Sequence, residues 1–226
     1  MLKFFYSTAP NPMKVALFLE ESGLEYEAVP VDTRKGEQHD PKYRSVNPNG
    51  KVPAIVDGDA TVFDSNAILL YLGEKTGKFM PENTPKARGE MLSWLMFVAS
   101  GIGPYSGQNV HFKMHAPEKI EYAMKRYEFE ANRHFGLLDA QLEGKKWILG
   151  DTYTIVDMAA WGWARMAPFV LGEEAAAKYK NVARLVETIN ARPAAQRAIA
   201  IKDRHAFKAE MDAESFKSMF PGTHGA

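Results

Sequence analysis

Two hydrophobic patterns divide the chain, and the change between them falls near residue 80. Up to about Thr76, short apolar runs bounded by turn residues alternate with segments whose apolar positions recur every three or four residues. Bounded runs are typical of buried strands, and the longer period is typical of amphipathic helices. This part therefore predicts a β-α-β unit, then a hairpin and a final helix. The expected strands are 2–6, 26–31, 52–56 and 61–63, and the expected helices are 11–22 and 65–76.

Only helical patterns appear after residues 78–85, a segment with two prolines that we interpret as a linker. The expected helices are 91–98, 118–142, 154–167 and 182–191, separated by Pro104, Pro117, Gly144, Pro168 and Pro193. The sequence thus predicts an α/β domain over residues 1–78, an all-α domain over 86–200 and a tail over 201–226. The tail carries enough large apolar side chains to dock on the rest of the protein.

Local signals mark several helix ends. Asn11 is a good N-cap with a proline after it, and Gly23 can adopt the left-handed conformation that closes a helix. Asp64 precedes the helix at residue 65 and can cap it. Thr154 and Asp157 have the spacing of a capping box, which we assign to folding rather than to function.

Charge and hydropathy exclude two classes of partner. The chain has 28 Lys and Arg against 28 Asp and Glu, so it lacks the basic excess typical of nucleic-acid binders. No apolar run approaches the roughly 18 residues of a membrane span. The first five residues lack the apolar stretch of a signal peptide, and we therefore expect a cytoplasmic protein.

The absence of cysteine restricts the chemistry further. The sequence contains no cysteine, which excludes disulfides, thiolate metal sites and a catalytic cysteine. Any sulfur chemistry must therefore use a thiol that the protein does not own. His111 and His115 lie four residues apart, but no acid completes a zinc motif around them, so we expect packing histidines and no metal.

Two short motifs allow a structural and a functional interpretation. Proline within Lys51-Val52-Pro53 would remove a donor from a strand. A cis Val52–Pro53 bond would expose the Val52 backbone to an extended ligand, whereas a trans proline at an edge strand is the alternative that X–Pro statistics favour. Asp64 and Ser65 can simply cap a helix. Alternatively, Ser65 and free backbone N–H groups could hold a carboxylate while Asp64 holds an ammonium group.

The segment 7–11 also allows a functional and a structural interpretation, whereas an aromatic segment at 161–163 favours a structural one. The segment Ser7 to Asn11 precedes a helix, where the helix dipole and a nearby donor could lower the pKa of a bound thiol. The alternative is an ordinary turn and cap. Trp161-Gly162-Trp163 falls within an all-α pattern, and we expect these residues in the core.

In this order, the motifs resemble a thioredoxin-like α/β N-terminal domain followed by an all-α C-terminal domain, as in the cytosolic glutathione transferases. The resemblance extends to about residue 200 and is strongest to the bacterial nu class. The segments that carry it are Pro10-Asn11 with Lys14, 17–21, Lys35-Gly36 with Gln38, Asn47-Pro48-Asn49, 51–57, 67–72 and Gly107-Gln108-Asn109 with His111-Phe112.

The resemblance implies a glutathione site. The Val52 backbone, presented by Pro53, would pair with the cysteinyl unit, and Asp64 and Ser65 would hold the γ-glutamyl end. Gln38 and Lys51 would meet the glycyl carboxylate. Asn11 would donate to the sulfur, while Arg126 would reach a second glutathione. Members of the class often carry threonine where this chain has Ala9, and here the hydroxyl is at Thr8 instead.

The implied activity is glutathione-dependent disulfide reduction, in which bound glutathione thiols supply both electrons. Conjugation of glutathione to electrophiles is one alternative, and a non-catalytic interaction module is another. We also expect a homodimer, because the segment 91–98, with Trp94 and Phe97, offers more apolar surface than a small bundle easily hides.

Overall fold

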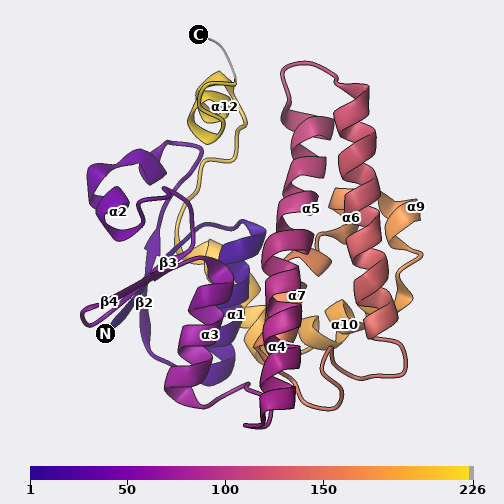
Figure 1. Cartoon of the computed structure of the whole chain (residues 1–226). Helices are drawn as coiled ribbons and strands as arrows, with labels where there is room; N and C mark the ends of the chain where they lie inside the picture. Colours follow the sequence, from indigo (N-terminus) through magenta and orange to yellow (C-terminus); the bar gives the residue numbers. More distant parts are fainter. Residues whose placement is uncertain (224–226) are drawn as a thin grey trace.

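A four-stranded mixed sheet lies beside a larger array of helices in the computed structural model, which describes residues 1–223 (Figure 1). The strand order is β2-β1-β3-β4, with β1 parallel to β2 and antiparallel to β3, and β3 antiparallel to β4. The strands are β1 (Leu2–Tyr6), β2 (Tyr26–Pro30), β3 (Ala54–Asp57) and β4 (Ala60–Phe63). Together with the helices, this is the thioredoxin-like plus all-helical architecture that the sequence predicts.

Three α-helices accompany the sheet, and the remaining helices follow it in the chain. The first three are α1 (Pro10–Ser22), α2 (Pro41–Val46) and α3 (Ser65–Thr76). The others are α4 (Pro85–Phe97), α5 (Gly103–Val110), α6 (Glu121–Gln141), α7 (Ile155–Ala164), α8 (Ala167–Leu171), α9 (Glu173–Ala176), α10 (Lys180–Asn190), α11 (Pro193–Ala200) and α12 (Ala213–Met219). Helix α1 ends at Gly23 in the left-handed conformation, as predicted.

Three prolines that we expected between helices, Pro104, Pro168 and Pro193, lie in the first turns of helices instead. Pro193 occupies the first turn of α11, where its missing N–H costs no intrahelical bond. Pro104 lies within a helical rod that runs from 85 to 115, next to a wider π-type stretch at Val98–Ile102. There the Gly103 N–H donates to the Val98 carbonyl five residues earlier. Such a bulge accommodates a proline without ending the helix.

One core runs through both parts of the chain, and α1 lies at its centre. Helix α1 packs against α7, α11 and α3, and its residues 12–19 are all buried. A smaller apolar cluster of Val31, Tyr43 and Ala54 lies under α2. No described helix is long and apolar enough to cross a membrane.

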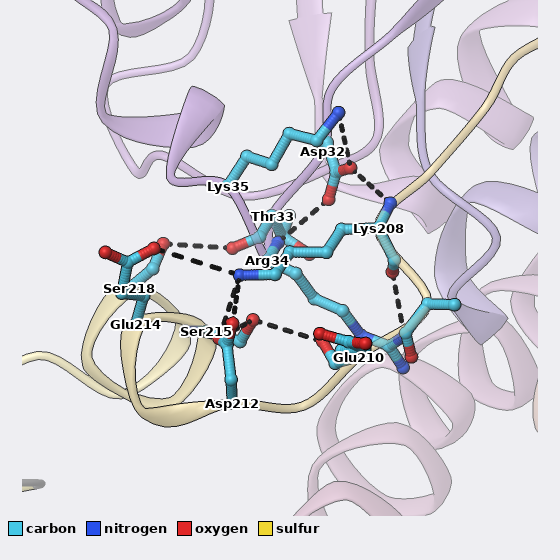
Figure 2. Close-up of polar contacts among 11 residues, drawn as sticks. Asp32, Thr33, Arg34, Lys35, Lys208, Glu210, Asp212, Glu214, Ser215 and Ser218 are labelled. Atoms are coloured by element: carbon cyan, nitrogen blue, oxygen red, sulfur yellow. Dashed lines mark hydrogen bonds and ion pairs between the residues drawn. The ribbon is translucent and has the colours of Figure 1, made fainter.

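The tail docks on the α/β part, as its apolar content suggested. It leaves α11 through a 3₁₀ turn at Ile201–Arg204 and runs extended to α12, which lies beside the loop before α2 (Figure 1). Figure 2 shows its anchors: Asp32 Oδ2 accepts from the Lys208 N–H at 2.6 Å, and Arg34 Nη1 donates to the Lys208 and Ala209 carbonyls at 2.9 and 2.6 Å. Residues 224–226 of the predicted tail lie outside the described residues.

The capping box at α7 has the predicted geometry and reaches further than the pattern implies. Asp157 Oδ2 accepts from the Thr154 N–H, and Oδ1 accepts from the Ile148 N–H, both at 2.8 Å. Asp157 is completely buried. One carboxylate thus caps α7 and fixes the loop that precedes it.

We expect Asp157→Ala to lower the free energy of unfolding by about 2–4 kcal/mol, because it removes a cap and leaves two buried N–H groups without acceptors. Urea denaturation would measure this loss. Asp151→Ala, at an exposed position in the same loop, is the matched control and should stay within about 0.5 kcal/mol of wild type. Equal midpoints for the two variants would show that the capping box is dispensable.

Candidate active site

Three adjoining cavities lie where the α/β part meets the helices and the tail. The first, which we call the α3 cavity, has a volume of about 380 Å³ and is lined by residues at the starts of α1 and α3, and by α5 and α7. The Val52 cavity, about 400 Å³, contains Val52, Lys51 and Gln38. The tail cavity, about 490 Å³, contains Thr8 and several tail residues. Lys51 lines the first two cavities, and Ser7 lines the last two, so each cavity adjoins the next.

Asp64 caps α3 and lies at the α3 cavity, so its structural role does not exclude a binding role. Its Oδ1 accepts from the Asn66 and Ala67 N–H groups at 2.9 and 3.3 Å. The residue has φ of 72° and remains exposed. The neighbouring Ser65 is buried, and its hydroxyl accepts from Lys14 Nζ at 3.3 Å. An acid, a hydroxyl and an ammonium group therefore meet at the start of one helix.

Asn11 is not the N-cap of α1, contrary to our expectation. The cap is Ala9, in an extended conformation, and Pro10 takes the first helical position. The sequence has two successive X-Pro pairs, Ala9-Pro10 and Asn11-Pro12, and the helix starts at the earlier pair. Asn11 therefore lies in the first turn with its side chain free of capping duty, where it lines the α3 cavity.

Trp163 fixes the direction of the Asn11 amide. Its indole Nε1 donates to Asn11 Oδ1 at 3.0 Å across 152 residues of sequence. Because an indole N–H can only donate, the amide oxygen must face it, and the amide NH₂ is left to donate elsewhere. We had assigned the whole Trp161–Trp163 segment to the core. Trp161 is fully buried, but Trp163 is half-buried and lines the α3 cavity.

Lys14 is a buried cation that sequence analysis did not single out as a site residue. Its side chain is 1% exposed and runs past Gly162 of α7, where an added Cβ would come within 2.5 Å of Lys14 Cγ. Burial lowers the pKa of Lys14 to about 7, and the nearby Asp64 carboxylate opposes this shift. The sequence offered two signals, a lysine within an otherwise apolar helix segment and its place beside Pro10-Asn11 in the family resemblance.

The Val52–Pro53 bond is cis, so the trans alternative that we favoured is wrong. Val52 lies outside the sheet ladder, because β3 begins at Ala54. The preceding Lys51 carbonyl accepts from the Tyr43 hydroxyl and from Asn47 Nδ2, both at 2.6 Å. Two buried side chains thus hold the backbone that presents Val52 to its cavity.

Gln38 lies in the Val52 cavity, but the tail already uses its amide. Gln38 Nε2 donates to the Ser218 carbonyl at 3.1 Å and contacts the Ser218 hydroxyl at 3.2 Å, and it also donates to the Thr33 carbonyl at 3.2 Å. Its Oε1 is buried without a hydrogen-bond partner among residues 1–223. Helix α12 therefore covers one end of this cavity (Figure 2 shows Ser218 beside Thr33).

The structure separates two of the expected residues from the rest. Thr8 is exposed and lines the tail cavity, whereas Asn11 lines the α3 cavity. Arg126 lies on α6, where its Nη1 donates to Glu130 Oε1 at 2.7 Å. It is not among the residues that line the three cavities. Within residues 1–223, no group of three or more His, Cys, Asp or Glu side chains is arranged to hold a metal ion.

Two family models match the chain. Residues 2–74 match the N-terminal domain of glutathione S-transferases, and residues 104–193 match the C-terminal domain. Among curated relatives, the disulfide-bond oxidoreductase YfcG of Escherichia coli is 39% identical over 206 residues, which cover 88% of this chain and 94% of YfcG. The disulfide-bond oxidoreductase YghU of the same organism is 39% identical over 214 residues, covering 87% of this chain and 73% of YghU.

Solved structures agree with this similarity. A glutathione transferase from Burkholderia graminis, with two glutathione molecules bound per subunit, is 37% identical with a TM-score of 0.84, covering 90% of this chain and 89% of that one. A glutathione transferase from Pseudomonas putida, with one glutathione disulfide bound per subunit, is 35% identical with a TM-score of 0.81, covering 88% and 91%.

The close packing of Lys14 against Gly162 generates a prediction. Gly162→Ala should lower the free energy of unfolding by about 1–3 kcal/mol, because the new methyl group would also come within 2.6 Å of the Pro10 carbonyl. Gly107→Ala is the matched control on α5, since its Cβ would meet only Trp163, at 3.7 Å. Alanine there should leave stability unchanged or raise it. Thermal denaturation of both variants tests this prediction. A wild-type melting temperature for Gly162→Ala would show that α1 and α7 are less tightly packed than described.

Proposed function

The chain belongs to the glutathione transferase superfamily, and on this premise we propose that it reduces disulfides with the thiols of bound glutathione. The observation that carries the proposal is the convergence of Asn11, Asp64 and Ser65 on one cavity in a chain without cysteine. Such a site can bind a thiol and activate it without a protein thiol. The names of the relatives, which include disulfide-bond oxidoreductases, support the same activity.

Glutathione would extend across the α3 and Val52 cavities. Asp64 would hold the ammonium group of the γ-glutamyl unit, and Ser65 would hold its carboxylate near the start of α3, where free N–H groups favour anions. The Val52 backbone would pair with the cysteinyl unit as an added strand does. The glycyl carboxylate would then lie near Lys51 and Gln38, which places the sulfur near the start of α1 and Asn11.

The reaction needs two thiols and moves two electrons. A glutathione thiolate attacks one sulfur of the substrate disulfide, forms a mixed disulfide and releases the other half as a thiolate. A second glutathione thiolate attacks the glutathione sulfur of the mixed disulfide, which yields glutathione disulfide and the second substrate thiol. The two protons lost by the glutathione thiols go to the two product thiolates. The tail cavity, with Thr8, would hold the substrate disulfide or the second glutathione; Arg126 would have to act from outside it.

Conjugation of glutathione to electrophiles is the second candidate function. It is favoured by the apolar side chains of the tail cavity, which are Met166, Phe169, Phe207, Met211 and Met219. Steady-state turnover separates the two activities. We expect a higher kcat/KM with glutathione and a small disulfide than with glutathione and an aromatic halide, and the reverse ranking would favour conjugation. A wild-type protein that binds neither reduced nor oxidised glutathione would be the non-catalytic module.

Asn11→Ala should raise the pKa of the bound glutathione thiol. A hydrogen bond to a charged group contributes about 1.5–3 kcal/mol, which corresponds to roughly one to two pKa units. Disulfide reduction near neutral pH should fall accordingly, and its rate should recover at higher pH. Asn11→Asp should be slower still, because it replaces the donor with a negative charge. The pH dependence of kcat/KM measures these effects.

Thr8→Val is the contrast for the Asn11 variants, since it removes the competing hydroxyl with little change of shape. Because Thr8 lies in the tail cavity, we expect its variant to keep the wild-type pH profile. Loss of turnover in Thr8→Val, with an unchanged profile in Asn11→Ala, would assign the sulfur donor to Thr8.

We also propose that the protein is a cytoplasmic homodimer that buries apolar surface of α4 and α6. Large apolar side chains exposed on these helices are Met96, Tyr122, Phe129 and Leu137. Symmetric pairing is the commonest way to cover such surface. Trp94 and Phe97, on which we based this expectation, are partly buried within the protomer.

Light scattering at micromolar concentration should therefore give twice the 25.3 kDa mass of one chain. Phe129→Glu should shift the mass toward that of one chain, because it places a charge on a residue that is 60% exposed in the protomer. A wild-type mass near that of one chain would contradict the proposal.

A further inference from the structure

We propose that Lys14 binds the α-carboxylate of the γ-glutamyl unit, so that the α3 cavity selects ligands that carry an ammonium group and a carboxylate on one carbon. This inference rests on the proposed glutathione site and adds to it a residue that our sequence analysis did not assign. Lys14 Nζ donates to Ser65 Oγ at 3.3 Å and lines the cavity that Asp64 also lines. A carboxylate bound at Ser65 would therefore lie within reach of the ammonium group.

The position of Lys14 is costly unless a ligand uses it. Lysine is almost never fully buried without a partner of opposite charge, yet this side chain is 1% exposed, its hydrogen-bond partner is a neutral hydroxyl, and the nearby Asp64 carboxylate only partly offsets the effect of burial on its pKa. Helix α7 carries glycine where the lysine stem passes, since a methyl group there would meet Lys14 Cγ and Cε. A methionine at position 14 would keep a similar stem without burying an ammonium group.

One anionic and one other cationic side chain line the cavity with Lys14, so a ligand carboxylate would add a second negative charge beside two lysines. The charged side chains that line the cavity with it are Asp64 and Lys51, and α7 contributes the uncharged Gly162 and Trp163. Asp64 caps α3 and, in the proposed complex, faces the ligand ammonium. Burial lowers the pKa of Lys14 to about 7. A ligand carboxylate beside Lys14 would raise this pKa again and so favour the protonated form.

The consequence is selectivity for a zwitterion rather than for a peptide in general. Asp64 precedes Ser65 in the chain and Lys14 donates to the Ser65 hydroxyl, so groups for the ammonium and the carboxylate of a γ-glutamyl unit line one cavity. A ligand without the carboxylate would leave the buried Lys14 with only the Ser65 hydroxyl and the nearby Asp64 as partners. The two subsites should therefore discriminate glutathione from 4-aminobutyryl-cysteinyl-glycine, which lacks only that carboxylate.

Calorimetric titration of Lys14→Met with both ligands tests the inference. Methionine keeps the length of the stem, so the variant should melt at or above the wild-type temperature. Wild type should bind glutathione at least about tenfold more tightly than the analogue, and Lys14→Met should lose most of that preference while its affinity for the analogue stays the same. Lys78→Met is the matched control, because Lys78 Nζ donates to the Ser22 carbonyl outside the cavities, and it should keep the wild-type preference.

Proton uptake gives a second readout that a structural role would not change. S-methylglutathione has no thiol to ionise, so its titration at pH 8 in buffers of different ionisation enthalpy reports protons taken up by its own amino group and by the protein. Wild type and Lys14→Met share the uptake at the ligand amino group, and wild type should exceed the variant by a large fraction of one proton as Lys14 becomes charged.

The outcomes are distinguishable. Equal losses of affinity for glutathione and the analogue in Lys14→Met, or equal proton uptake by the variant and wild type, would overturn the inference alone. A wild-type protein that binds neither ligand would overturn the proposed function itself, and the inference with it.

Discussion

The burial of α1 on all sides is the constraint on which the rest of the structure depends. This helix packs against α3 beside the sheet and against α7 and α11 of the helical array, so it belongs to both parts of the core. Its residues 12–19 are all buried, which leaves no freedom for the helix to rotate or slide. The positions of Asn11 and Lys14 follow from this packing, because both lie within its first two turns. A site built on α1 therefore gains its precision from contacts that have no chemical role.

The same packing determines where the tail begins. Helix α11 contacts α1, and the chain then passes the end of β1, where the Tyr6 hydroxyl donates to the Ile201 carbonyl at 3.1 Å. From there the tail reaches the 32–39 loop and closes one side of two cavities. Ser218 accepts from the Gln38 amide, which faces the glycyl carboxylate in the proposed complex. The segment that closes these cavities lies beyond the two family models, which end at residue 193.

Sequence analysis succeeded where the cause of a feature is local. Gly23 and Asp64 end and start helices through their own conformations and side chains, and Asp157 lies three residues from its partner Thr154. It failed at Asn11, because two X-Pro pairs competed for one helix start, and at Val52–Pro53, because the surrounding structure selects the isomer. The roles of Trp163 and Lys14 depend on contacts between α1 and α7 that are about 150 residues apart in sequence. No periodicity or local motif carries such information.

A chain that must borrow its thiol can contribute only position and charge, and the charges of these cavities match the ligand proposed for them. Lys51 is a cation, Asp64 is an anion, and Lys14 becomes a cation beside a carboxylate, whereas glutathione carries two carboxylates and one ammonium group. Each of these ligand charges would meet an opposite protein charge in the proposed complex, with Arg44 as a further cation at the Val52 cavity, and the thiolate would have no charged partner there. The groups remaining for it are the Asn11 amide, whose NH₂ is directed away from Trp163, and the start of α1. The dipole of a helix start stabilises an anion. In the proposed complex, complementary charge at the two ends of glutathione would therefore fix the peptide, and the uncharged donors at its centre would be free to stabilise the thiolate that reacts.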